Sequence, residues 1–202
     1  TRSYAEVSMS DIAEAKGRQE LYTKQAPQLL QALREMAMVE SVESSNRIEG
    51  VTVRHDRLRP LVLGNTRPRD RSEEEIQGYR IALQQIHTSA DSLPVVPQTL
   101  QGLHRTIQEG AGDAGQYKRV DNDIIEFRTH HAPRVRFRTL PFPEVPQAME
   151  ELCLSYRHAL DQDHVPALVA TACLILDFLC IHPFRDGNGR TSRLLTVLAL
   201  YH

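Results

Sequence analysis

The chain has 202 residues, of which 41% are hydrophobic and 25% charged, and its formal charge is -2. These values are typical of a globular domain of ordinary size, alone or with a small appendage. The balanced charge argues against a nucleic-acid or membrane-binding surface, and a 5% aromatic share without Trp argues against base stacking. The longest apolar run, Ala167–Ile181, is too short for a membrane span.

The first half of the chain has a helical pattern. Apolar residues at helical spacing predict a helix that continues to Gly50, a residue that tolerates the left-handed backbone at a helix end. Ser72–Glu75 matches a capping box at the start of a second helix. Pro97 can open a third helix, with Gly110 as its stop. The arginines at Arg67–Arg71 favour a solvated loop between the first two helices.

A β-like segment follows between Gly115 and Pro146. One strand is expected around Val120–Ile125 and a second around Val135–Phe137, with the polar stretch Arg128–His131 between them. The second strand carries alternating arginines within a basic stretch, Arg128–Arg138, which favours exposure to solvent. The segment therefore predicts a β-hairpin or an extended flap.

Helices then resume and surround a short loop. The pattern predicts a helix from about Pro146 to Leu160, then a buried central helix over Val165–Ile181. A final helix follows the loop His182–Gly187. The three cysteines, Cys153, Cys173 and Cys180, lie in these helical patterns without metal-ligand spacing. They are expected to be buried reduced thiols in a cytoplasmic protein.

The segment His182–Arg193 has the features of a polyphosphate site. Gly187 and Gly189 allow close approach of a ligand to the backbone just before a helix, whose first amides attract anions. Arg190 and Arg193 are three residues apart, so both can project from one face of that helix toward the outer phosphates.

Other side chains in this segment supply chemistry. Asp186 precedes the glycines and is placed to hold Mg²⁺ against the phosphates. His182 lies four residues earlier and can accept a proton from an attacking hydroxyl near neutral pH. Phe184 is expected to anchor the loop in the core, and Asn188 to donate to a phosphate. The pattern differs from a Walker A loop and from the dinucleotide fingerprint.

The segment resembles the signature of the Fic (filamentation induced by cAMP) family, His-Pro-Phe-x-Asp-Gly-Asn-Gly-Arg-x-x-Arg. Every defining position is matched: His182, Pro183, Phe184, Asp186, Gly187, Asn188, Gly189, Arg190 and Arg193. The resemblance implies a mainly α protein, a Fic-type helical bundle with a short β-hairpin flap over the active site. It also implies ATP as substrate, Mg²⁺ as cofactor, and AMP transfer to Ser, Thr or Tyr hydroxyls of a target protein. In that family the counterpart of His182 is the base, that of Asp186 binds the metal, and those of Asn188 and the arginines bind phosphate.

A second motif lies upstream at Ser45–Gly50. Ser45 and Glu49 are four residues apart on one helix face, and Gly50 closes the helix. On its own this is an ordinary polar helix end. Beside the signature it resembles the inhibitory motif of the Fic family, in which the glutamate pairs with the second signature arginine. The resemblance implies that Glu49 pairs with Arg193 and inhibits the enzyme.

The resemblance also implies an organisation. We expect an N-terminal helical region at 1–95 with the inhibitory motif at 45–50, and a Fic core at 96–202 with a flap at about 115–138 and the signature loop at 182–193. A target protein is expected to dock at the flap by strand addition. In the family, the related Doc kinases have Lys at the position of Gly189, so Gly189 favours AMP transfer over phosphorylation.

The sequence is also compatible with other activities and partners. One alternative is removal of AMP from a modified protein by the same site, with Glu49 orienting a water. Another is a nucleotide-sensing transcriptional regulator, although the chain shows no basic recognition helix. A homodimer is possible, and membrane or nucleic-acid partners are not expected.

Overall fold

The computed structural model describes residues 11–12, 14–15, 17–18, 27–126, 132–162 and 164–202. The chain forms two compact units, residues 1–41 and residues 42–202. Helix α2 (Pro27–Ile48) ends in the second unit. The motif at 45–50 begins in its last turn, and Glu49 and Gly50 lie in the turn that follows, just past the predicted helix face.

The second unit is mainly helical, as the sequence predicts. Its further elements are α3 (His55–Val62), α4 (Arg71–Ser89), η1 (Ala90–Ser92), α5 (Pro97–Ile107), β1 (Ile124–Glu126), β2 (Arg134–Phe137), η2 (Phe142–Glu144), α6 (Val145–Asp161), α7 (Ala167–Ile181) and α8 (Asn188–Ala199). The fold class is therefore a helical bundle with a small antiparallel hairpin.

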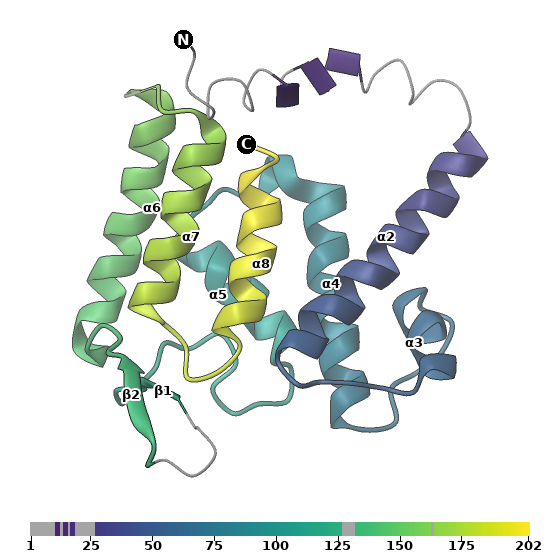
Figure 1. Cartoon of the computed structure of the whole chain (residues 1–202), viewed down its shortest axis with the longest axis horizontal. Helices are drawn as coiled ribbons and strands as arrows, with labels where there is room; N and C mark the ends of the chain where they lie inside the picture. The colour runs from purple at the N-terminus through teal and green to yellow at the C-terminus, as the bar shows by residue number, and fades with distance from the viewer. Residues whose placement is uncertain (1–10, 13, 16, 19–26, 127–131, 163) are drawn as a thin grey trace. The chain divides into compact units, whose positions relative to one another are not determined.

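Helix α8 is the central helix of this unit. It packs against α4, α5 and α7 (Figure 1), and most of its residues are buried, including Leu194, Leu195 and Leu198. The prediction that Val165–Ile181 is the buried central helix was wrong. Helix α7 buries one stripe through Leu174 and Phe178 but exposes Val169 and Leu176, because it has α6 and α8 on only part of its circumference.

The start of α4 also differs from the prediction. The N-cap is Asp70, whose side chain accepts a hydrogen bond from the Glu73 backbone N–H at 2.9 Å, so the predicted cap at Ser72 is two residues too late. The stretch predicted as a solvated loop, Arg67–Arg71, lies at this helix start. Arg71 belongs to the helix and pairs with Glu75 at 3.0 Å, so part of the arginine cluster is structural.

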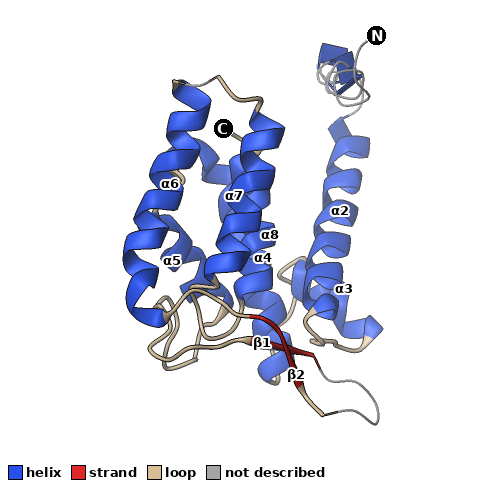
Figure 2. Cartoon of the chain, turned by 60° about the vertical axis from the view of Figure 1, so that its left-hand side comes forward, coloured by secondary structure: helices blue, strands red, loops and turns tan. Residues whose placement is uncertain are grey.

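The predicted hairpin is present. Strands β1 and β2 pair antiparallel, with Ile125 opposite Val135 and a register irregularity after Ile124. Val120 precedes the strand instead of belonging to it, and residues 127–131, including the predicted polar stretch, lie outside the described residues. Figures 1 and 2 show the hairpin at the end of the helices where the α7–α8 loop also lies.

Several helix ends follow the predicted signals. Pro97 is the first residue of α5, and Gly50 adopts φ +79° just after α2. Helix α5 ends at Ile107, three residues before Gly110.

The three cysteines are free thiols, but the expectation of burial holds only for Cys153, since Cys173 is exposed on α7 and Cys180 is half-buried. In the part of the chain that the structure describes, no helix has the length and apolar character of a membrane span.

Candidate active site

His182 follows the last residue of α7. It caps that helix with a left-handed backbone, φ +53° and ψ +60°, and its N–H donates to the Phe178 carbonyl at 3.0 Å. The residue is half-buried, and Nδ1 is enclosed without a hydrogen bond of normal geometry to any described residue. Burial lowers the pKa of His182, while the Leu179 backbone acts in the opposite direction. A neutral imidazole with Nδ1 enclosed leaves Nε2 as the nitrogen suited to accept a proton.

The loop after His182 is fixed from inside. Phe184 is fully buried and stacks on the ring of His104 from α5, with centroids 3.7 Å apart. Asn188 closes the loop, because its side chain accepts from the Phe184 N–H at 2.9 Å and donates to the Phe184 carbonyl at 2.7 Å. The expected anchor at Phe184 is therefore present. The Asn188 side chain is buried and shapes the loop from within.

His104 holds the loop from the α5 side. Its Nδ1 accepts from the Gly115 N–H at 2.9 Å, and Nε2 lies 3.0 Å from the carbonyl oxygen of Asp186. One ring nitrogen must accept and the other donate, which defines a neutral tautomer. Burial lowers the pKa of His104, in agreement with this neutral state.

The N-terminus of α8 has no side-chain cap. Its N-cap is Gly187, with φ +76°, and a Cβ there would lie 2.8 Å from the Gln108 amide nitrogen. Glycine is thus required both by the left-handed backbone and by the close packing. The first amides of a helix have no partner within the helix, and here no cap side chain covers them. They form a site that favours negative charge.

Asp186 is exposed beside this helix start, and one carboxylate oxygen accepts the Gly187 N–H at 2.7 Å. Within the described residues, no group of three or more His, Cys, Asp or Glu side chains is arranged to hold a metal ion. Mg²⁺ in nucleotide sites is held by one or two carboxylates together with phosphates and waters. A single exposed carboxylate next to an anion site fits an ion that arrives with a nucleotide.

Arg193 faces the end of α2. Its Nε donates to Ser45 Oγ at 2.6 Å, and its Nη2 donates to the Ser45 carbonyl at 3.0 Å and to Glu49 Oε1 at 2.7 Å. The side chains of Arg193 and Glu49 remain 30% and 31% exposed. A Cβ on Gly189 would overlap the Glu49 carboxylate. The Glu49 carboxylate therefore lies directly against the backbone of Gly189, which belongs to the first turn of α8.

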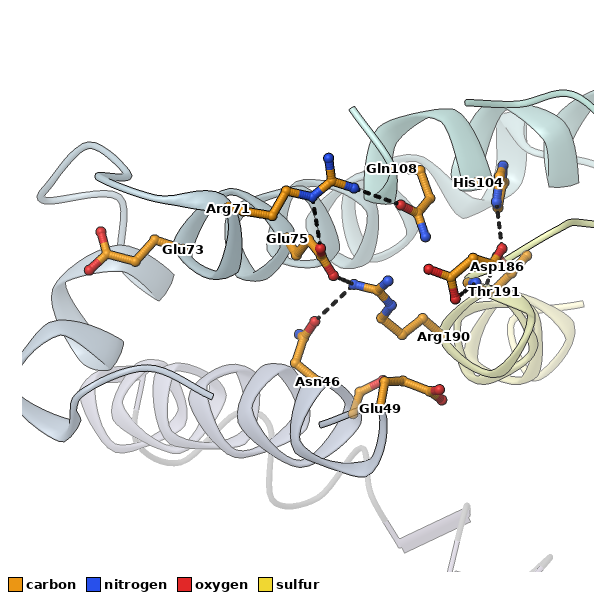
Figure 3. A network of polar contacts seen from close by, with 12 residues as sticks. Asn46, Glu49, Arg71, Glu73, Glu75, His104, Gln108, Asp186, Arg190 and Thr191 are labelled. Atoms are coloured by element: carbon orange, nitrogen blue, oxygen red, sulfur yellow. Dashed lines mark hydrogen bonds and ion pairs between the residues drawn. The ribbon is translucent and has the colours of Figure 1, made fainter. Parts of the chain in front are cut away.

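Arg190 has a different environment. It is 2% exposed, and its Nη1 donates to Glu75 Oε2 at 2.6 Å and to Asn46 Oδ1 at 3.4 Å. Glu75 also accepts a hydrogen bond from Arg71 Nε at 3.0 Å. Arg71 Nη2 in turn donates to Gln108 Oε1 at 3.5 Å (Figure 3). The phosphate-binding role expected for Arg190 stays a prediction, and in this structure its guanidinium joins α8 to α4 and to the end of α2.

Sequence reasoning missed the residues that support the site. Glu75 and Asn46 lie within the predicted capping box and the upstream motif, and Tyr79 lies on an apolar helix face, but none of the three was assigned to the site. Tyr79 is buried beside Ser45 and Arg193, and burial raises its pKa. The one available signal was charge spacing, since Arg71 and Glu75 are four residues apart. Nothing in the sequence linked Glu75 to Arg190.

Solved structures of other proteins share this fold. A Fic domain containing signaling protein from Bacteroides thetaiotaomicron superposes with a TM-score of 0.78 at 23% identity, over 94% of this chain and 72% of the other. A Fic family protein from Desulfovibrio desulfuricans gives 0.73 at 26% identity, over 99% and 58%. Fic-1 from C. elegans gives 0.68 at 20% identity, over 96% and 58%. The chain thus spans less than two thirds of the latter two proteins.

The fold and the loop define a helical domain with an uncapped helix start, whose amides favour negative charge, next to a half-buried histidine. Residues 94–200 match the Fic/DOC family profile, and the chain belongs to that family. Fic domains are known for AMPylation-type transfer, and the family commonly includes transferases.

Proposed function

We propose that the protein transfers AMP from ATP to a Ser, Thr or Tyr hydroxyl of a target protein, and that Glu49 holds this activity back. The observation that carries the proposal is the uncapped start of α8 at Gly187, placed between His182 and Arg193. The site thus combines a base, an anion cradle and a guanidinium in one segment. Reactions at phosphorus need little more than positioning and charge stabilisation.

The proposed reaction is a displacement at the α-phosphorus of ATP. The target hydroxyl oxygen forms a bond to that phosphorus, and the bond from the phosphorus to the oxygen bridging to the β-phosphate breaks. Pyrophosphate leaves, and the hydroxyl proton passes to Nε2 of His182. The low pKa of His182 keeps the imidazole neutral and ready to accept that proton near pH 7.

Other parts of the site fit the nucleotide. The amides of the first turn of α8 and Arg193 suit the phosphates. Asp186 would hold Mg²⁺, which neutralises phosphate charge when bound. The exposed strands β1 and β2 offer an edge on which an extended target segment can add as a strand.

Glu49 supports the inhibitory part of the proposal. Its carboxylate pairs with Arg193 and lies against Gly189, where phosphate oxygens would approach the helix start. Charge-assisted hydrogen bonds of this kind are among the stronger ones. While Glu49 remains there, Arg193 is not free to bind an outer phosphate. The negative charge of the Glu49 carboxylate also repels the triphosphate.

The reaction class is tested by labelling with ATP that carries the label on either the α- or the γ-phosphate. The Glu49→Gly variant should retain α-label on protein and no γ-label, and the Glu49→Gly, His182→Ala double variant should lose about 10²–10⁴-fold in rate. Retained γ-label would instead indicate phosphorylation. Absence of both labels would count against any transfer reaction.

A second reaction is favoured by the position of Glu49 in the site. A water oriented by this carboxylate could replace the target hydroxyl and release AMP from a modified protein. Protein labelled by the Glu49→Gly variant provides the substrate. Release of the label by wild type, but not by Glu49→Gly, would support AMP removal as an activity of the engaged state.

A further inference from the structure

Lys118 is a buried lysine at the base of the flap, against the signature loop. Its residue is 5% exposed, and it is the one lysine in the described part of the chain. Its ammonium donates to Thr139 Oγ1 at 2.8 Å and to Asn122 Oδ1 at 2.9 Å. A buried lysine needs such partners, because burial of its charge is otherwise costly.

The same residue contacts the backbone on both sides of His182. Its Nζ lies 3.3 Å from the Ile181 carbonyl oxygen, and its backbone N–H donates to the Pro183 carbonyl at 2.8 Å. Between these two bonds, His182 adopts φ +53°, a conformation that non-glycine residues seldom adopt and that surrounding contacts must hold. Lys118 supplies two of those contacts.

The partners of Lys118 also come from both ends of the flap. Asn122 precedes β1 and donates to the Phe184 carbonyl at 2.8 Å, and Thr139 follows β2 and donates its N–H to Asp123 at 3.2 Å. The hairpin is therefore joined at its base to the residues that flank His182. A change at this base alters the flap and the histidine together.

We propose that Lys118 is a positioning residue that fixes the backbone of His182 and holds the flap in a constant place relative to it. The proposal rests on the function proposed above, in which the flap presents the target hydroxyl to His182. Lys118 then sets the distance between the acceptor and the base. Misplacement of a reacting group by about 1 Å can cost about 10²-fold in rate.

The charges around His182 give a readout that does not depend on transfer. Burial is the main cause of the lowered pKa of His182; the positive charge of Lys118 lowers it further, and the charges of Glu49 and Asp186 raise it. Burial lowers the pKa of Lys118 itself, and Asp121 and Asp123 oppose that change. Removing the Lys118 charge should raise the pKa of His182, whereas an arginine at this position keeps the charge.

The experiment uses the full chain with Glu49→Gly as parent, and adds Lys118→Met, Lys118→Arg or the control Arg119→Met. Arg119 is exposed and pairs with Gln116 at 2.8 Å, so its loss removes a neighbouring charge without touching His182. Each variant is measured by NMR titration of His182 and by the kcat and KM for ATP in labelling.

Lys118→Met should raise the pKa of His182 and lower kcat by about 10²-fold with little change in KM for ATP. Lys118→Arg should retain the lowered pKa and recover part of kcat, and Arg119→Met should match the parent. An unchanged His182 titration in a folded Lys118→Met protein would overturn the proposal, and so would a loss confined to KM.

A second variant keeps the test decisive if Lys118→Met does not fold. Thr139→Val removes one flap partner of Lys118 and should shift the His182 resonances, and unchanged resonances would contradict the coupling. If the Glu49→Gly parent transfers no label, the proposed function fails. The titration arm then still decides whether Lys118 positions His182.

Discussion

Arg190 and Arg193 lie three residues apart on α8, yet their surroundings are opposite. Arg190 is 2% exposed and pairs with Glu75 on α4 at 2.6 Å, whereas the Arg193 side chain is 30% exposed and pairs with Glu49 after α2 at 2.7 Å. The two ion pairs are almost equally short. Burial, not distance, distinguishes them.

This difference in burial gives the two arginines different roles. A buried ion pair that loses one member leaves an uncompensated charge in the protein interior, so it acts as a permanent part of the fold. An exposed pair contributes little to stability because water and salt compete with it. Arg193 can therefore lose Glu49 with little loss of fold stability, while Arg190 keeps α8 in place.

Loss of the buried partner should have the largest effect. Glu75→Ala leaves Arg190 buried without its carboxylate, and we expect the free energy of unfolding to fall by about 3–5 kcal/mol. Urea unfolding measures this. The matched control is Glu74→Ala, since Glu74 is exposed on the same helix and should change stability by less than about 0.5 kcal/mol. Equal effects of the two substitutions would contradict a structural role for the Glu75–Arg190 pair.

Acidic pH should lower the free energy of unfolding by less than the Glu75→Ala substitution does. Burial lowers the pKa of His104 and of His182, so below pH 6.5 the unfolded chain binds protons that the folded chain resists. Stability should be full above pH 6.5 and fall as the pH decreases from 6.5 toward the lowered pKa values. Unfolding at pH 7 and pH 5 measures the loss. His104→Gln should reduce this pH dependence, and an unchanged pH dependence in a folded variant would contradict the neutral tautomer of His104.

The smallest effect is expected at the exposed pair. Glu49→Gly should change the free energy of unfolding by no more than about 1 kcal/mol, because both side chains are near one third exposed. A double-mutant cycle with Arg193→Ala measures the coupling between the two residues. A coupling as large as the effect of Glu75→Ala would show that the two pairs are energetically alike and would undo the comparison.

The sequence predicts those parts of the site that depend on neighbours along the chain. The loop from His182, the helix start at Gly187 and the hairpin after Gly115 all follow from local residue patterns. The expected pairing of Glu49 with Arg193 came from a resemblance between motifs, and the structure places these two side chains in contact.

The remaining features depend on partners distant in sequence. Spacing alone gave Arg190 and Arg193 the same expected role, because it does not reveal that Glu75 meets one of them. The choice of α7 as the buried helix failed for a related reason. Its composition is the more apolar, but burial follows from the number of packed neighbours, and α8 has three.

The central claim is that Glu49 blocks the site by occupying Arg193. The most direct test is the initial rate of α-label incorporation by wild type, Glu49→Gly, Arg193→Ala and the double variant Glu49→Gly, Arg193→Ala. We predict strong labelling by Glu49→Gly alone, because only this variant removes the carboxylate while keeping the guanidinium for the phosphates. Labelling of Arg193→Ala at the rate of Glu49→Gly, or equal labelling of wild type and Glu49→Gly, would contradict the claim.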